Sequence, residues 1–443
     1  MKTPSRSRAR RRSELALAAT ALLAWTGCGD KSLTDVRPDG SVPATDGSRG
    51  EAGDGRDAAV QSNRNEYDLL FLIDDSSSMA VVQQKLLAQL PTFMQVLQAL
   101  PGGLPSVHIA VVSSDMGAPS DTSIGCSAAG DQGVFFSRPQ GTCTATTLTA
   151  GSTFITDDVT GNSKNFTAPD PAGLPSVFQC IGLLGTAGCG FGHQLASIDR
   201  ALGADGLGPS PLMDQGFLRE GAYLGIVIVS NQDDCSAPAG SPRYSLNGGS
   251  SDLGNPLGPL THYRCNLAGH LCQDLNSGST DMTKFASPPL NPPSWHDGTA
   301  DAPTLTLSNC ESNDDSSSGL TPVSKFITDI KALKPDPANQ ILVSAITGVN
   351  GTDPSTLTST PYTIAWLPGA GSASNELWPQ IAHACGPAGP GTAPGGHITT
   401  DGSFADPAVR IAQFVRAFGS NGVLTSACDD NYASAMAAIA ARI

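Results

Sequence analysis

Residues 67–79 read Tyr-Asp-Leu-Leu-Phe-Leu-Ile-Asp-Asp-Ser-Ser-Ser-Met, and this stretch decides the fold. Its first part, residues 68–73, is a nearly continuous apolar run, which is typical of a strand buried on both faces. Alternate residues of an extended chain point the same way, so Asp74, Ser76 and Ser78 are expected to converge where the strand opens into a loop. One carboxylate and two hydroxyls suit a hard cation such as Mg²⁺ better than Zn²⁺. A simpler alternative is a helix start, with Ser76 or Ser78 as its N-cap.

The segment Ile73–Met79 also resembles the Asp-x-Ser-x-Ser motif of von Willebrand factor type A (VWA) domains. In that family the motif is the core of a metal-ion-dependent adhesion site (MIDAS). The resemblance implies a doubly wound α/β fold, a bound Mg²⁺ (or Mn²⁺ or Ca²⁺) and a role in protein binding and adhesion. In the family, a Thr from a later loop and an Asp at the end of the central strand complete the metal shell.

These two further ligands have candidates in the chain. Thr186, in a Gly-rich loop before a helix, matches the Thr, and an alternative alignment puts Cys189 there. Asn231 falls on the Asp position, where its neutral oxygen should weaken the site unless Asp233 also reaches the metal. Asp233 and Asp234 are alternatively solvated loop acids or ligands of a second cation.

The remaining elements follow from apolar periodicity. Strands are expected at 107–113, 223–230 and 341–346, with a short edge strand at 154–155. Helices are expected at 80–100, 195–202, 322–333, 408–418 and 431–443. Apolar strands that alternate with helices predict a mostly parallel, doubly wound sheet with helices on both faces. Two Gly-, Ser- and Pro-rich stretches, about 116–180 and 235–320, are expected to be loop-like insertions at the carboxyl edge of this sheet.

The N-terminal residues predict export. A basic segment and a short apolar stretch precede Thr26-Gly27-Cys28, which resembles a bacterial lipobox, so residues 1–27 are expected to be a lipoprotein signal peptide and Cys28 the lipidated residue. Residues 28–64 have almost no large apolar side chains and are expected to form a disordered tether. The VWA-like domain is then expected over 65–443. Gly29 is compatible with sorting to the outer membrane.

Cysteine usage fits an exported protein. Removing Cys28 from the 11 cysteines leaves ten, and these are expected to form disulfides, because none lies in a C-x-x-C pair that would favour zinc. The pairs expected from closeness along the chain, then across an insertion and near the end, are Cys126–Cys143, Cys180–Cys189, Cys265–Cys272, Cys235–Cys310 and Cys385–Cys428.

The net charge and the motifs limit the classes of function that the chain can have. The net charge of −15 excludes nucleic acid as a partner, because such a surface repels phosphates. The chain is expected to be a cell-envelope lipoprotein, held to the membrane by its lipid alone, that binds an extracellular or periplasmic protein or glycan through a divalent metal. It is not expected to be an enzyme. One alternative keeps the fold with a degenerate metal site and binds through the stapled loops, and another is an exported metal-dependent hydrolase with cations held by Asp74, Asp115 and Asp233.

Overall fold

The computed structural model describes residues 66–99, 103–118, 126–138, 143, 147–158, 164–167, 173–207, 216–244, 262–275, 305–349, 362–368, 377–389 and 391–441. All of them belong to one of the two units into which the chain divides, Ala59–Ile443. The expected signal peptide, the lipidation site Cys28 and the tether lie outside the described residues.

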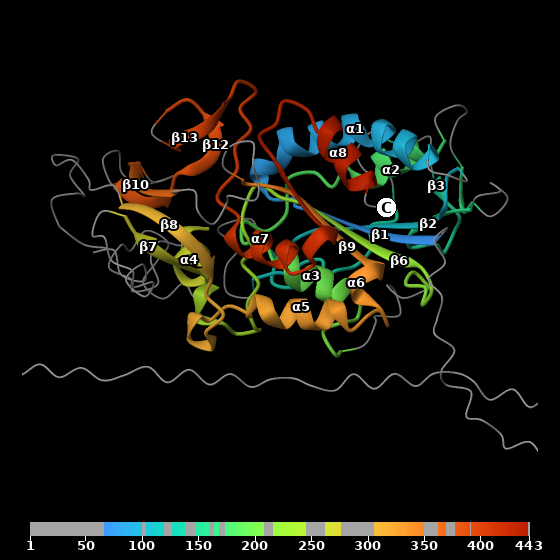
Figure 1. The fold of residues 1–443 in the computed structure, drawn as a ribbon, viewed down its shortest axis with the longest axis horizontal. Helices are drawn as coiled ribbons and strands as arrows, with labels where there is room; N and C mark the ends of the chain where they lie inside the picture. The colour runs from blue at the N-terminus through green and yellow to red at the C-terminus, as the bar shows by residue number, and fades with distance from the viewer. Residues whose placement is uncertain are drawn as a thin grey trace, which may run out of the picture. The chain divides into compact units, whose positions relative to one another are not determined.

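A six-stranded sheet forms the centre of this unit (Figure 1). Its strand order is β14-β9-β6-β1-β2-β4. All neighbouring pairs are parallel except that of the edge strand β4 with β2, which is antiparallel. The strands are β1 (Glu66–Ile73), β2 (Ser106–Val112), β4 (Ile155–Asp157), β6 (Tyr223–Val229), β9 (Ile341–Thr347) and β14 (Gly422–Ser426). The mostly parallel α/β sheet expected from the sequence is therefore present.

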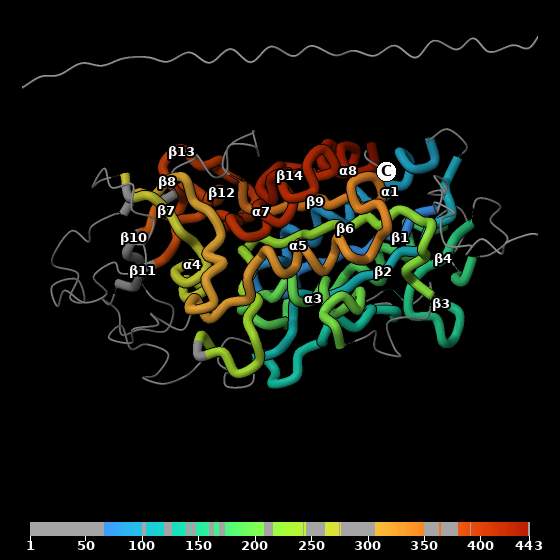
Figure 2. Tube along the Cα trace, turned by 60° about the horizontal axis from the view of Figure 1, so that its bottom comes forward, coloured from blue at the N-terminus to red at the C-terminus, as the bar shows by residue number. Residues whose placement is uncertain are grey.

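Helices cover both faces of this sheet. α1 (Ala80–Gln98), α2 (Gly173–Gly182) and α8 (Ala433–Ala440) contribute to one hydrophobic cluster, and α3 (Gln194–Ala201), α5 (Val323–Lys331) and α7 (Val409–Arg416) to a second. Figure 2 shows α7 alongside β9 and β14.

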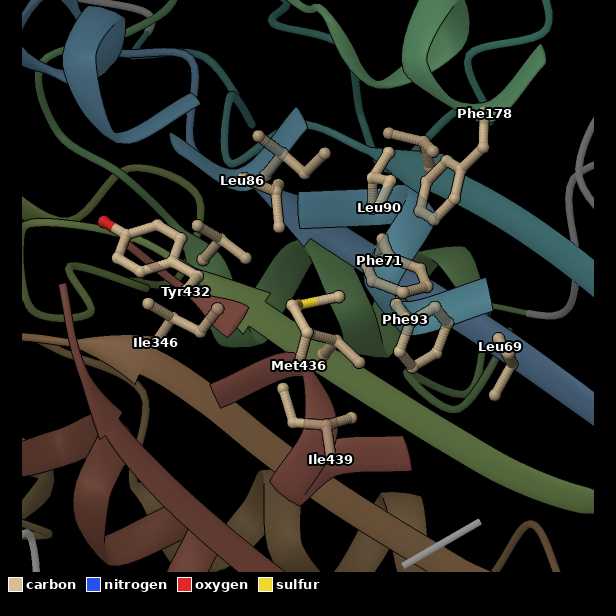
Figure 3. Packing of buried hydrophobic residues seen from close by; sticks show 14 of the residues in the cluster. Leu69, Phe71, Leu86, Leu90, Phe93, Phe178, Ile346, Tyr432, Met436 and Ile439 are labelled. Carbon is tan, nitrogen blue, oxygen red and sulfur yellow. The ribbon is translucent and has the colours of Figure 1, made fainter. Parts of the chain in front are cut away.

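Successive side chains of strand β1 lie alternately in the two hydrophobic clusters. Leu69, Phe71 and Ile73 lie in the first cluster, whereas Leu70 and Leu72 lie in the second. Two aromatic contacts surround Phe71 in the first cluster (Figure 3): the Phe71 ring packs edge-on against Phe93 and Phe178, with ring centroids 5.8 and 4.5 Å apart. The continuous apolar run of β1 thus reflects burial on both faces, and truncating Phe71 to alanine should cost about 3–5 kcal/mol.

The winding of the sheet reverses between β1 and β6. From β1 the chain moves to β2 on one side, and it later returns to β6 on the other side of β1 before it continues to β9 and β14. The carboxyl ends of β1 and β6 therefore lie side by side where the connections diverge. In open α/β sheets, ligands bind at such a switch point.

Neither of the two expected insertions is purely loop-like, and the second departs further from the expectation. It contains α4 (Tyr263–Gly269), β7 (His270–Asp274) and β8 (Leu305–Ser312). With β10 (Tyr362–Pro368) and β11 (Leu377–Ile381), these strands form an antiparallel sheet of order β11-β10-β8-β7. Asn309 has a positive φ of 49° in β8, and the β7–β8 pairing shifts register nearby. Such an irregularity interrupts the two-residue period by which a strand is recognised in a sequence.

Other short elements complete the described chain. Besides β4 and the start of α2, the first insertion contains β3 (Thr147–Leu148) and β5 (Phe166–Thr167), which pair with each other. β12 (His383–Pro387) and β13 (Thr392–Thr399) form a parallel pair, and α6 (Pro337–Gln340) precedes β9. In the described part of the chain, no helix combines the length and apolar composition that a membrane crossing needs.

The ten cysteines form five disulfides, as expected, but four of the expected pairs are wrong. The bonds are Cys126–Cys189, Cys143–Cys180, Cys235–Cys265, Cys272–Cys310 and Cys385–Cys428, of which the last alone was expected. Closeness along the chain did not decide the pairing. Cys272 and Cys310, for example, are 38 residues apart and meet because β7 and β8 pair in an antiparallel sheet.

Candidate functional site

The carboxyl ends of β1 and β6 meet at the switch point of the central sheet. The backbone N–H of Asp74 donates to the carbonyl of Val229 over 2.9 Å, which ties the two strand ends together. A short 3-10 helix, Ser77–Met79, then leads directly into α1. The Asp-x-Ser-x-Ser segment is thus held between a strand end and a helix start.

The carboxylate of Asp74 is fully buried and accepts four hydrogen bonds from neutral donors. Its Oδ1 accepts the Ser76 N–H (2.8 Å) and the Ser114 hydroxyl (3.2 Å). Its Oδ2 accepts the Ser230 hydroxyl (2.6 Å) and the Gln194 side-chain amide (3.4 Å). No Lys, Arg or His within the described ranges forms an ion pair with it. A buried negative charge surrounded by dipoles alone is costly to maintain.

The side-chain oxygens of Ser76, Ser78 and Asn231 contact one another in turn, and the Ser76 backbone N–H bonds the Asp74 carboxylate. The hydroxyl oxygens of Ser76 and Ser78 are 3.4 Å apart, and the Ser78 hydroxyl donates to Asn231 Oδ1 over 3.1 Å. The Asn231 amide also donates to the Ser78 carbonyl over 3.4 Å. Ser76 does occupy the N-cap position of the 3-10 helix, as the alternative predicted, but its side chain makes no capping hydrogen bond, and Ser78 lies inside that helix.

The spacing of these oxygens can be compared with that in a cation shell. Neighbouring ligands of an octahedral ion lie about 2.9 Å apart for Mg²⁺ and about 3.3–3.6 Å apart for Ca²⁺, given their usual metal–oxygen distances. The separations of 3.4 and 3.1 Å lie between these limits. Both separations are hydrogen-bond contacts, and a divalent cation could use the same oxygens as ligands.

Gln194 and Ser230, which no sequence motif pointed to, belong to the same group. The Gln194 amide nitrogen bonds both Asp74 Oδ2 and the Ser230 hydroxyl, the latter over 2.9 Å. The Gln194 Oε1 is buried and has no hydrogen-bond partner among the described residues. Ser230 directly follows β6. Its position at the end of a predicted strand is the one sequence feature that could have pointed to it.

Two expected ligands are not brought to this group. Thr186 is exposed in the loop between α2 and α3, and no hydrogen bond of the group involves it. Cys189, its alternative, is bonded to Cys126 and is therefore not available as a ligand. The Gln83 side-chain amide instead links this loop to the site, because it donates to both the Asp74 carbonyl and the Gly185 carbonyl.

Asp233 serves as a cap for α7. Its two oxygens accept the N–H groups of Arg410 (2.9 Å) and Ile411 (3.0 Å), and His270 Nε2 lies 2.6 Å from its Oδ2. Burial alone would raise the pKa of Asp233, but the hydrogen bond and charge of His270 and these two N–H groups outweigh it and hold the pKa below its usual value. Both oxygens are occupied by these contacts, so they do not point to a role as a metal ligand.

Asp234 caps the N-terminus of α3 in a similar way. Its Oδ1 accepts the Leu195 N–H over 2.9 Å, and its Oδ2 pairs with the buried guanidinium of Arg410 over 3.0 Å. Asp233 and Asp234 are therefore buried structural carboxylates and not the solvated loop acids of the alternative interpretation.

Asp75, Asp115 and Asp131 form a second group of carboxylates near Asp74. Burial, and after it the negative charges of Asp74, Asp115 and Asp131, raise the pKa of Asp75 to about 8. Asp115 accepts the Gly117 N–H over 2.8 Å and so shapes the loop after β2. In the described part of the chain, no three His, Cys, Asp or Glu side chains are grouped so as to hold a metal ion. Asp74, Asp115 and Asp233 accordingly do not form the cluster that a metal-dependent hydrolase would need.

Comparisons of the chain with models of protein families, with curated proteins and with solved structures found no match.

Proposed function

We propose that this chain is a cell-envelope lipoprotein whose VWA-like domain holds a divalent cation at Ser76, Ser78 and Asn231 and binds a protein or glycan partner through it. The observation that carries the proposal is the set of three side-chain oxygens in mutual contact, 3.4 and 3.1 Å apart, in a segment whose Ser76 N–H bonds the buried Asp74 carboxylate at the switch point of the sheet. The chain is proposed to bind and not to catalyse.

The buried charge of Asp74 supports a cation at this place. The four donors around Asp74 are neutral. Burial first, and then the negative charge of Asp74, raise the pKa of neighbouring Asp75. A bound cation would supply an open coordination position for an acidic group of the partner. Asp74 would balance its charge, while Ser114, Ser230 and Gln194 keep that carboxylate oriented.

Two adjacent serines provide a matched test. Ser78 bonds Asn231, whereas Ser77 is exposed. By calorimetry with Mn²⁺ and Ca²⁺, we expect the wild type and Ser77→Ala to bind a cation at millimolar concentration or below, and Ser78→Ala to bind at least tenfold more weakly. Absence of cation binding by the wild type, or equal losses in both variants, would contradict the proposal.

A metal-free site is the second candidate, and one observation favours it. Four hydrogen bonds already satisfy both oxygens of Asp74, and hydrogen bonds to a carboxylate can stabilise its charge without an ion. In that case the disulfide-stapled loops would bind the partner. The wild type would then bind neither Mn²⁺ nor Ca²⁺, while partner binding would persist in a chelating buffer.

The proposed lipid anchor is tested separately, because Cys28 lies outside the described residues. In a bacterial host, Cys28→Ser should leave an uncleaved precursor without lipid label. Normal processing and labelling of this variant would exclude the anchor without bearing on the cation.

A further inference from the structure

The segment of residues 401–406, which follows β13, ends at the carboxyl edge of the central sheet beside Asn231. Its last residue, Asp406, donates its backbone N–H to the Asn231 carbonyl over 2.8 Å. The Asp406 carbonyl lies so close to Gly348, directly after β9, that a Cβ atom at Gly348 would come within 1.7 Å of the carbonyl oxygen. Glycine at position 348 therefore makes this approach possible. The backbone of Asp406 is thus packed against the residues that follow both β6 and β9.

The bond from Asp406 is the stronger of two that hold the Asn231 backbone in the described part of the chain. The other runs from the Asn231 N–H to the sulfur of Met79 over 3.3 Å, and a thioether is a weak acceptor. The Asn231 side chain in turn meets Ser78, whose hydroxyl donates to its Oδ1 over 3.1 Å. Displacement of Asp406 should therefore move Asn231, a proposed cation ligand, relative to Ser78.

His383, at the start of β12, holds the side chain of Asp406. Its Nδ1 lies 2.6 Å from Asp406 Oδ1, and it carries the proton of this bond because a carboxylate accepts and does not donate. The His383 ring also stacks on Phe404, with ring centroids 4.1 Å apart. The intervening residue, Ala405, donates its N–H to the Cys385 carbonyl over 2.9 Å. Strand β12 therefore fastens residues 404–406 through both side chains and backbone.

We propose that His383 is a positioning residue for the candidate site. It fixes the Asp406 carboxylate, and through the Asp406 backbone it keeps Asn231 where its oxygen meets the Ser78 hydroxyl. The bond is suited to this role, since hydrogen bonds to an ionised group are stronger than neutral ones and the two side chains are 27 % and 13 % exposed. The inference rests on the proposed function where it concerns the cation, and on the contacts above where it concerns Asn231.

The next part of the loop after β6 provides an internal reference. Asp233 lies two residues after Asn231 and is fastened separately, because its Oδ1 accepts the Ile411 N–H at the start of α7 over 3.0 Å. This bond involves neither His383 nor Asp406. Loosening the His383–Asp406 pair should therefore release Asp406 and Asn231 while α7 stays capped.

Amide hydrogen exchange of the full chain without added cations tests the positioning itself. His383→Phe keeps a ring for the stack but removes the Nδ1 donor, so the Asp406 amide should exchange about fivefold faster, as the loss of one hydrogen bond would give. The Ile411 amide should be unchanged. His383→Asn, whose side-chain amide can donate in place of Nδ1, should restore slow exchange. His397→Phe on the neighbouring strand β13 is the matched control, because His397 is exposed.

Calorimetry with Mn²⁺ and Ca²⁺ extends the test to the cation. His383→Phe should bind about fivefold more weakly than the wild type, whereas His383→Asn and His397→Phe should bind as the wild type does. Asp406→Ala should weaken binding to a similar extent. Adding His383→Phe to Asp406→Ala should change nothing further, because His383 acts through Asp406.

Unchanged exchange of the Asp406 amide in folded His383→Phe would overturn the inference. Equal cation affinity in His383→Phe and the wild type, no rescue by His383→Asn, or additive losses in the double variant would also overturn it. A wild type that binds neither ion would refute the proposed function instead, and the exchange of the Asp406 amide would then decide this inference by itself.

Discussion

The Ser230 hydroxyl donates to Asp74 Oδ2 over 2.6 Å and joins two residues that are 156 positions apart in the chain. It links the end of β6 to the end of β1 at the switch point of the sheet. Ser230 also accepts a hydrogen bond from the Gln194 amide over 2.9 Å. The carboxylate of Asp74 is thus both the proposed balance for a cation and the centre of a buried polar network, and substitutions there should affect stability as well as binding.

Asp74→Ala should destabilise the protein by about 3 kcal/mol, because it leaves several buried donors without an acceptor. Asp74→Asn keeps one oxygen as an acceptor and should cost less. Both should abolish cation binding, since both remove the carboxylate charge. Urea unfolding and calorimetry with Mn²⁺ measure the two effects. Cation binding by Asp74→Asn equal to that of the wild type would contradict the role assigned to the charge.

Asn231→Asp should make stability depend strongly on cations. Without a cation, the new carboxylate lies in the same buried polar group as Asp74 and should lower the melting temperature through repulsion. With Mn²⁺ or Ca²⁺, the added charge should tighten binding and raise the melting temperature above that of the wild type. Asn431→Asp is the control, because Asn431 is exposed and its side-chain oxygen accepts the Ala433 N–H. If the melting temperature of Asn231→Asp does not change when Mn²⁺ or Ca²⁺ is added, the metal-free site would be favoured.

Asp75 should make stability fall as the pH rises. Its folded pKa is raised from 3.8 to about 8, by burial first and then by the charges of Asp74, Asp115 and Asp131. Between about pH 4 and 8, Asp75 is therefore protonated in the folded state and ionised in the unfolded state. Its contribution to the free energy of unfolding is fully present below pH 4 and is lost as the pH rises through 8. Asp75→Asn should flatten the decline in a series of urea titrations across this range, whereas the exposed Asp430→Asn should not. Identical pH profiles for the wild type and Asp75→Asn would refute the shift.

Arg410→Met should destabilise the protein by about 3–5 kcal/mol, because it leaves Asp234 as a buried charge without its partner. The pair is fully buried, and Arg410 Nη2 lies 3.0 Å from Asp234 Oδ2. Adding Asp234→Asn should recover part of the loss, since the uncompensated charge is then removed. Arg416→Met on the same helix should cost about 1 kcal/mol or less, because Arg416 is partly exposed. Denaturant unfolding of the four proteins would measure this, and similar losses for Arg410→Met and Arg416→Met would exclude the mechanism.

Much of the central sheet could be predicted because its signals are local. The apolar runs of β1, β6 and β9 mark strands buried on both faces, and their boundaries differ from the expected ones by one or two residues. The second, antiparallel sheet could not be predicted, because β8 is irregular at Asn309 and β10 and β11 lie in stretches of mixed composition. Strand β14 and helix α2 also had no clear periodic signal.

The sequence by itself determined the strand that ends at Ile73 and the residues that follow it, because an apolar run and alternating polar side chains depend only on neighbours along the chain. Only the tertiary structure decided that Ser114, Gln194 and Ser230 surround Asp74, that Asp233 caps α7, and which cysteines pair. These contacts join segments up to 178 residues apart. They exist because parallel strands bring the ends of distant segments to one edge of the sheet, where each buried polar group bonds whichever partner the packing places beside it.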